Sequence, residues 1–151
     1  MTNSPATLSF AAALQMAVQA RQVCEGQGFS VAVSVVDRQA QPLVLLVSDG
    51  AFAHAWKTSQ SKARTAASRR APSGEVAGDN SHEQSLSQAF HAVGLTTLSG
   101  GLPVVFEQHV IGGIGISGAP GQNDLGQDFD NLCAKAGIKA IGAQTLFGTE
   151  P

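Results

Sequence analysis

Charged residues, basic runs and long apolar stretches are all scarce in this chain, and each absence excludes a class of protein. Only 13% of the 151 residues are charged, and the net charge is −2. The longest basic run, Arg69-Arg70, is too short for the basic stripe with which nucleic-acid-binding modules contact phosphates. No apolar stretch is long enough to span a bilayer, and residues 1–5 lack the basic and apolar regions of a signal peptide. We therefore expect a cytoplasmic protein that binds neither nucleic acid nor membrane.

Cysteine and metal-binding motifs are also rare. The two cysteines, Cys24 and Cys133, lie far apart in the sequence, and in a reducing compartment we expect both to be small buried hydrophobic residues. No pair of histidines has the H-x-x-x-H spacing, and there is no C-x-x-C, so a structural metal site is not expected. A G-x-S-x-G nucleophile elbow is missing as well, which leaves a hydrolase without sequence support.

Apolar residues and glycines are abundant instead. The hydrophobic fraction of 43% is enough for a core, and the length fits one domain over residues 1–151. A chain of this size buries roughly 68–70% of its unfolded surface and needs no covalent staple. Because so weakly charged a surface is prone to self-association, we expect a homo-oligomer.

Hydrophobic periodicity predicts an α+β fold with the element order α-ββ-αα-βββ-α. Hairpins on both sides of a helical insertion indicate an antiparallel sheet of about five strands with helices packed against it, as in profilin-like or PAS-like architectures. The C-terminal tail, 138–151, either extends the last helix or covers a sheet edge. The expected helices are 8–25 after an N-cap at Thr7, 54–70, 82–93 and 125–136 with Gly137 as C-cap, and the expected strands are 30–36, 43–47, 95–98, 103–107 and 110–117.

The glycine-rich hairpin between Gly100 and Gly118 is the most unusual segment. Gly100-Gly101 can expose bare backbone N–H groups to a ligand. On the following strand Gly113 and Gly115 share one face, which leaves room either for a flat ligand or for a closely packed helix, and the glycines alone favour the helix. A dinucleotide-binding fingerprint does not fit, because these glycines lie inside a strand.

Several segments, in this order, resemble the GlcG/HbpS family, which includes the C-terminal domain of PduO-type proteins. The resemblance runs from about Thr7 to Gly137. It implies a compact, usually oligomeric sheet-and-helix domain that binds a small ligand, since several members bind haem and others have no settled activity. The segments are Val35–Arg38, Asp49–Ala51, Lys62–Ala66, Ala71-Pro72, Gly100–Pro103 and Val110–Gly118.

With this resemblance, the face of the second helix becomes a candidate pocket wall opposite the glycine strand. Lys62 and Thr65 share a helix face, and a lysine and a hydroxyl beside an apolar pocket can hold a carboxylate or a haem propionate. Their spacing alone favours a solvated helix surface, with Thr65 bonded back to its own helix. Trp56, the only tryptophan, would stack on a planar ligand or pack in the core or an oligomer contact.

His54 departs from the small or apolar residue that the resembling segments usually carry at this place. It is a candidate axial haem ligand or catalytic base, and a solvent-facing histidine is the alternative.

Three functions follow from these observations. The first is a binding domain for haem or a related planar or acidic small molecule. The second is a small cofactor-independent isomerase, lyase or cyclase acting on an oxygenated metabolite, with His54 as base and the Gly100-Gly101 amides as an oxyanion pocket. The third is an oligomeric structural subunit with a vestigial pocket.

Overall fold

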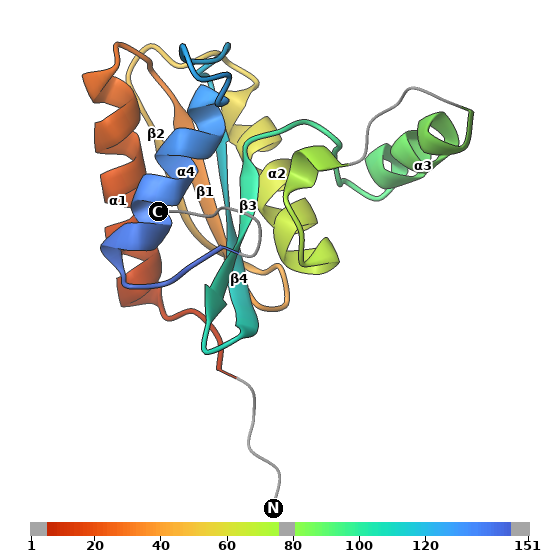
Figure 1. Ribbon diagram of the computed structural model, residues 1–151, viewed down its shortest axis with the longest axis horizontal. Coiled ribbons are helices and arrows are strands. Elements are labelled where there is room, and N and C mark those ends of the chain that lie inside the picture. The colour runs from red at the N-terminus through yellow and green to blue at the C-terminus, as the bar shows by residue number, and fades with distance from the viewer. Residues whose placement is uncertain (1–5, 76–80, 146–151) are drawn as a thin grey trace, which may run out of the picture.

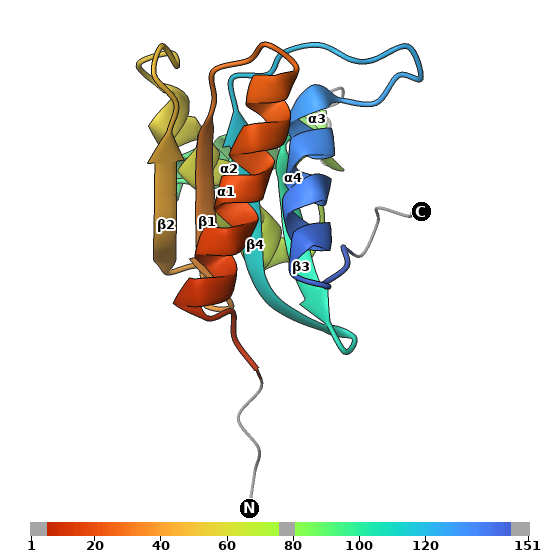
Figure 2. The ribbon, with the colours of Figure 1, turned by 90° about the vertical axis from the view of Figure 1, so that its left-hand side faces the viewer.

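A four-stranded antiparallel sheet lies between two layers of helices in the computed structural model, which describes residues 6–75 and 81–145 (Figure 1). The strand order is β2-β1-β4-β3. Figure 2 shows α1 and α4 side by side on one face of the sheet, with α2 behind the other face. The elements are α1 (Phe10–Gly26), β1 (Ala32–Asp37), β2 (Pro42–Val47), α2 (Ala55–Arg69), η1 (Ser73–Glu75), α3 (Ser81–Ala92), β3 (Gly101–Phe106), β4 (His109–Ser117) and α4 (Phe129–Ala140).

The predicted α+β class and element order are confirmed, but the described sheet has one strand fewer than expected. Residues 95–98 form no strand. The Thr96 N–H donates to the Thr65 hydroxyl of α2 at 2.9 Å, so this segment bonds to a helix side chain and joins no ladder. None of the described helices is long and apolar enough to cross a membrane.

The N-terminus of α1 begins later than its sequence suggests. Ser9, and not Thr7, is the N-cap, and its hydroxyl accepts a hydrogen bond from the Ala12 N–H at 3.2 Å. The Thr7 hydroxyl instead accepts from the Arg38 N–H at 3.2 Å, which ties the N-terminal segment to the β1–β2 turn.

The last helix is also displaced from its predicted bounds. Asp128 caps α4 by accepting from the Asn131 N–H, whereas Leu125 precedes the helix and is exposed. Gly137 lies inside α4 and not at its end. A Cβ on Gly137 would lie 2.6 Å from the Met16 carbonyl oxygen, so this glycine serves the close contact between α4 and α1.

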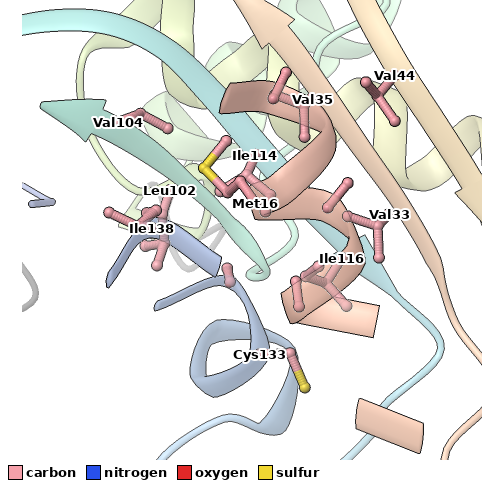
Figure 3. Packing of buried hydrophobic residues seen from close by; sticks show 14 of the residues in the cluster. Met16, Val33, Val35, Val44, Leu102, Val104, Ile114, Ile116, Cys133 and Ile138 are labelled. Atoms are coloured by element: carbon pink, nitrogen blue, oxygen red, sulfur yellow. The ribbon is translucent and has the colours of Figure 1, made fainter. Parts of the chain in front are cut away.

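The main core fills the space between the sheet and the α1–α4 layer (Figure 3). Met16 of α1 is fully buried and belongs to a cluster of branched side chains from all four strands. The alternation of side chains along each strand explains this one-sided set, since residues two apart share a face. Its labelled members include Val33, Val35, Val44, Leu102, Val104, Ile114, Ile116 and Ile138.

A disulfide between Cys24 and Cys133 joins α1 to α4, so the expectation of two unpaired cysteines is wrong. The cysteines are 109 positions apart in sequence, but their Cα atoms are 5.7 Å apart because the two helices pack side by side. Disulfides persist mainly in oxidising compartments. The cysteines therefore lend no support to a cytoplasmic location, which stays a prediction.

The described part of the C-terminal tail does both things that the sequence left open. Residues 138–140 complete α4, and Gln144 then pairs with Val105 at the outer edge of β3 through two backbone hydrogen bonds of 2.6 and 2.9 Å. The tail thus protects a strand edge that would otherwise be open to pairing with other chains. Residues 146–151 lie outside the described part of the chain.

Candidate functional site

The side chain of Lys62 points from α2 toward the sheet, where it is buried and not exposed to a ligand. Its ammonium donates to the Ile116 carbonyl oxygen at 2.7 Å and to Asp130 Oδ2 at 3.2 Å, and only 4% of the residue is exposed. Asp130 also accepts from the Ala119 N–H at 3.0 Å. Lys62 therefore connects α2, β4 and α4, and two of the three donors of its ammonium group are already used by these elements.

The environment of Asp130 opposes its charge. Burial raises the pKa of the Asp130 carboxyl above its ordinary value, while the Lys62 ammonium and the Ala119 N–H act in the opposite direction. An isolated buried carboxylate is costly, so the lysine compensates a charge that the fold has already desolvated. This balance is typical of a structural ion pair.

Thr65 is fully buried and has a structural part too. Its hydroxyl donates to the Ser61 carbonyl oxygen at 2.7 Å and accepts from the Thr96 N–H at 2.9 Å. Thr65 thus anchors the segment before β3 to α2. Sequence spacing placed Lys62 and Thr65 on one helix face correctly, but that face turns toward the sheet and not toward a pocket.

The space above the glycine strand is filled by α2 itself. A Cβ on Gly113 would lie 2.5 Å from the Ala63 carbonyl oxygen, and one on Gly115 would overlap the Ser59 carbonyl oxygen. The prediction of a ligand lying between this strand and α2 is wrong for the described structure. The alternative, a helix packed closely on the glycines, is correct.

The Gly100-Gly101 amides are likewise taken by protein groups. The Gly100 N–H donates to Asn131 Oδ1 at 3.1 Å, and the Gly101 N–H donates to the Ser73 hydroxyl at 2.9 Å. A Cβ on Gly101 would overlap the Lys62 carbonyl oxygen. These amides are therefore not free to form the predicted oxyanion pocket. The enzyme hypothesis loses the hydrogen-bond donors that would stabilise a negatively charged intermediate.

His54 and Trp56, by contrast, are both exposed at the N-terminal end of α2. The His54 ring stacks on Phe52 with 5.8 Å between ring centroids and 14° between ring planes. His54 occupies the N-cap position without a side-chain capping bond, so its imidazole nitrogens are not used by the helix. Phe52 is 62% exposed and Trp56 is 46% exposed. We call Phe52, His54 and Trp56 the aromatic surface.

Only two of the three residues of the aromatic surface could be singled out from the sequence. His54 and Trp56 stood out as a departure from the family pattern and as the only tryptophan, but Phe52 gave no periodic signal because it lies in a loop. Asp130, the partner of Lys62, was missed because it lies 68 positions away. Within the described ranges, no group of three or more His, Cys, Asp or Glu residues is arranged to hold a metal ion.

Comparison with known proteins agrees with this fold and with the resemblance seen in the sequence. The model of a family described as haem-degrading protein HbpS-like matches residues 8–139. The chain belongs to this family. A search of curated proteins finds no match.

Solved structures extend the comparison to nearly the whole chain. A double mutant of HbpS from Streptomyces reticuli is 34% identical, with 99% of this chain and 92% of that chain covered and a TM-score of 0.77. ORFY of Klebsiella pneumoniae is 29% identical, with 93% and 94% covered and a TM-score of 0.78. PduOC in complex with haem is 25% identical, with 92% and 98% covered and a TM-score of 0.74.

Proposed function

We propose that this protein binds haem, and that it does so at the aromatic surface. The observation that carries the proposal is the stacked pair of Phe52 and His54, with Trp56 exposed two residues further along the chain, so that three exposed rings occur at one end of α2. Family membership supports haem as the ligand, because the family is described by haem degradation and one similar structure is a haem complex.

The residues of the aromatic surface fit the needs of haem. A porphyrin requires apolar contact over a flat face, which exposed phenylalanine and tryptophan rings provide. Its iron requires an axial ligand, and a neutral histidine nitrogen is a common one. Bound haem would supply redox chemistry at its iron. In this chain, His54 would hold the iron, and Phe52 and Trp56 would hold the ring.

A hemin titration followed by absorbance tests the proposal. We expect saturable binding at micromolar concentrations with a shift of the Soret band. The His54→Ala variant should bind at least about tenfold more weakly and give a different Soret maximum, because it removes the residue that would hold the iron. His109→Ala is the matched control, since His109 is also exposed but lies at the distant β3–β4 turn. Absence of saturable binding, or equal spectra for wild type and His54→Ala, would refute the proposal.

We also propose that the protein forms a homo-oligomer. Figure 1 shows α3 standing away from the rest of the molecule, and Val93 and Leu98 beside it are 63% and 55% exposed. Exposed apolar surface of this kind favours association with further protein. Light scattering after size exclusion should give a multiple of 15.4 kDa at micromolar concentration. A mass of one chain under these conditions would contradict the proposal.

A further inference from the structure

A second polar site lies at the other end of α2, where the helix ends beside the β1–β2 turn. A cavity of about 280 Å³ that is widely open to solvent lies there, and Gln39, Ser68 and Arg70 at its margin are exposed. Because α2 spans 15 residues, the cavity is about 20 Å from the aromatic surface along the helix axis. The residues that line it are Arg38, Gln39, Ala67, Ser68, Arg70 and Val110.

Close packing fixes the two walls of this cavity relative to one another. Ala40 of the β1–β2 turn packs against a small buried cluster of Val36, Ala63 and Ala67, which joins the turn to α2. Asp37 Oδ1 accepts hydrogen bonds from the Gln39 and Gln41 N–H groups at 2.9 and 3.0 Å, which fixes the turn itself. Arg38 and Gln39 therefore lie on a turn that is fixed by the Asp37 hydrogen bonds and by the packing of Ala40 against α2.

Arg70 lines the cavity from a second element, because it is the C-cap residue of α2. Its backbone is left-handed, with φ 58° and ψ 40°, and its N–H donates to the Ala66 carbonyl oxygen. This conformation is rare for a residue with a side chain. A glycine or asparagine would end the helix with less strain.

Neither Arg38 nor Arg70 takes part in an ion pair among the side chains that the structure describes. The ion pairs among them are Arg21–Glu25 and Lys62–Asp130, and neither involves Arg38 or Arg70. Asp37 is the nearest carboxylate in sequence to Arg38, and one of its oxygens already accepts two turn amides. The C-terminal end of α2 contributes only about half a negative charge, which two cations outweigh.

We propose that this cavity is a binding site for a small organic anion that carries two negative charges. Two arginines from different elements, the β1–β2 turn and the end of α2, suit two oxyanion groups, or two faces of one, because each guanidinium forms a planar fork of donors. The Ser68 hydroxyl and the Gln39 amide add uncharged hydrogen-bonding groups, and Ala67 and Val110 offer apolar contact to a short carbon skeleton. The site is independent of the haem proposal, since it shares no residue with the aromatic surface.

Calorimetric titration with succinate and, separately, with inorganic phosphate tests this site at low ionic strength and pH 7. We expect saturable millimolar or tighter binding of at least one probe to the wild-type protein. Tighter binding of succinate identifies a dicarboxylate site, and tighter binding of phosphate identifies a phosphoryl site. If neither probe binds, the proposal is wrong.

Variants place the binding event in the cavity. Arg38→Gln and Arg70→Asn should each weaken binding about tenfold or more, because each removes charge-assisted hydrogen bonds. Asparagine tolerates the left-handed backbone at position 70, so the helix end is kept. Lys139→Gln is the control, as it removes one exposed charge from the last turn of another helix, α4. Unchanged binding in the Arg38→Gln/Arg70→Asn double variant, or equal weakening by Lys139→Gln, would overturn the proposal.

Discussion

At the scale of single residues, the buried ion pair of Lys62 and Asp130 holds three elements together. The lysine is contributed by α2 and reaches a carbonyl oxygen on β4 and a carboxylate on α4. Removing one partner of a buried pair is costly because the other charge stays desolvated. The pair therefore accounts for a lysine in a sheet-facing position of a helix.

Lys62→Met should lower the free energy of unfolding by about 3–5 kcal/mol at pH 7. Burial already raises the pKa of Asp130, and removing the ammonium raises that pKa further. A carboxyl whose pKa is higher in the folded state stabilises the fold at low pH, and this contribution is lost as the pH rises through the folded-state pKa. The loss in Lys62→Met should thus be larger at pH 8 than at pH 4.5, as measured by urea denaturation. Lys139→Met is the exposed control, and an equal loss at both pH values would contradict this account.

Gly115 makes a second test at this scale. A Cβ at this position would overlap the Ser59 carbonyl oxygen and would lie 2.6 Å from the Ala63 nitrogen, so α2 would have to move away from β4. We expect Gly115→Ala to destabilise the protein by at least about 1–3 kcal/mol in thermal or urea denaturation. Gly26→Ala is the matched control, since a Cβ there meets no atom within 4 Å. Equal stability of the two variants would show that α2 does not pack on the glycines.

The residue types in the sequence indicated which segments carry polar and glycine-rich patterns, but not whether those side chains face the core or the solvent. Lys62 and Thr65 were correctly placed on one face of a helix. Whether that face is buried depends on Asp130 and Thr96, which are distant in sequence and give no local signal. The glycines had two physical interpretations, and only the position of α2 distinguishes them.

At the scale of elements, the α1–α4 layer is fixed by close contact and by a covalent link. Gly137 lets α4 approach Met16, and Cys24–Cys133 joins the same two helices. The disulfide was not predicted because nothing in the sequence reports which helices are neighbours. Most helix and strand positions were predictable from periodicity, but the expected strand at 95–98 is absent, and the start of α4 depended on Asp128 as N-cap and was missed.

The Cys24→Ala/Cys133→Ala double variant should unfold more easily than the wild-type protein. A cross-link between residues 109 positions apart restricts the unfolded chain strongly, and loss of a native disulfide typically costs about 2–5 kcal/mol. Urea denaturation with and without a reductant measures the effect. Reduction should destabilise the wild-type protein and leave the double variant unchanged. A reductant with no effect on the wild-type protein would mean that the disulfide is not present in solution.

At the scale of the whole molecule, α2 separates two surfaces with different chemistry. Its N-terminal end carries exposed rings and a histidine, and its C-terminal end contributes Arg70 to a cavity that Arg38 of the β1–β2 turn also lines. The sheet face between them is occupied by the helix itself. Sequence resemblance predicted the family and a small ligand, but placed the ligand under α2, because a local pattern does not show that the helix fills that space.

The amide NMR spectrum of the protein with and without hemin tests most directly where haem binds. The iron of hemin broadens signals from nearby residues. We predict selective loss of the backbone signals of residues 51–57, with the signals of residues 67–70 retained. Loss of signals confined to another part of the molecule, or an unchanged spectrum, would contradict haem binding at Phe52, His54 and Trp56.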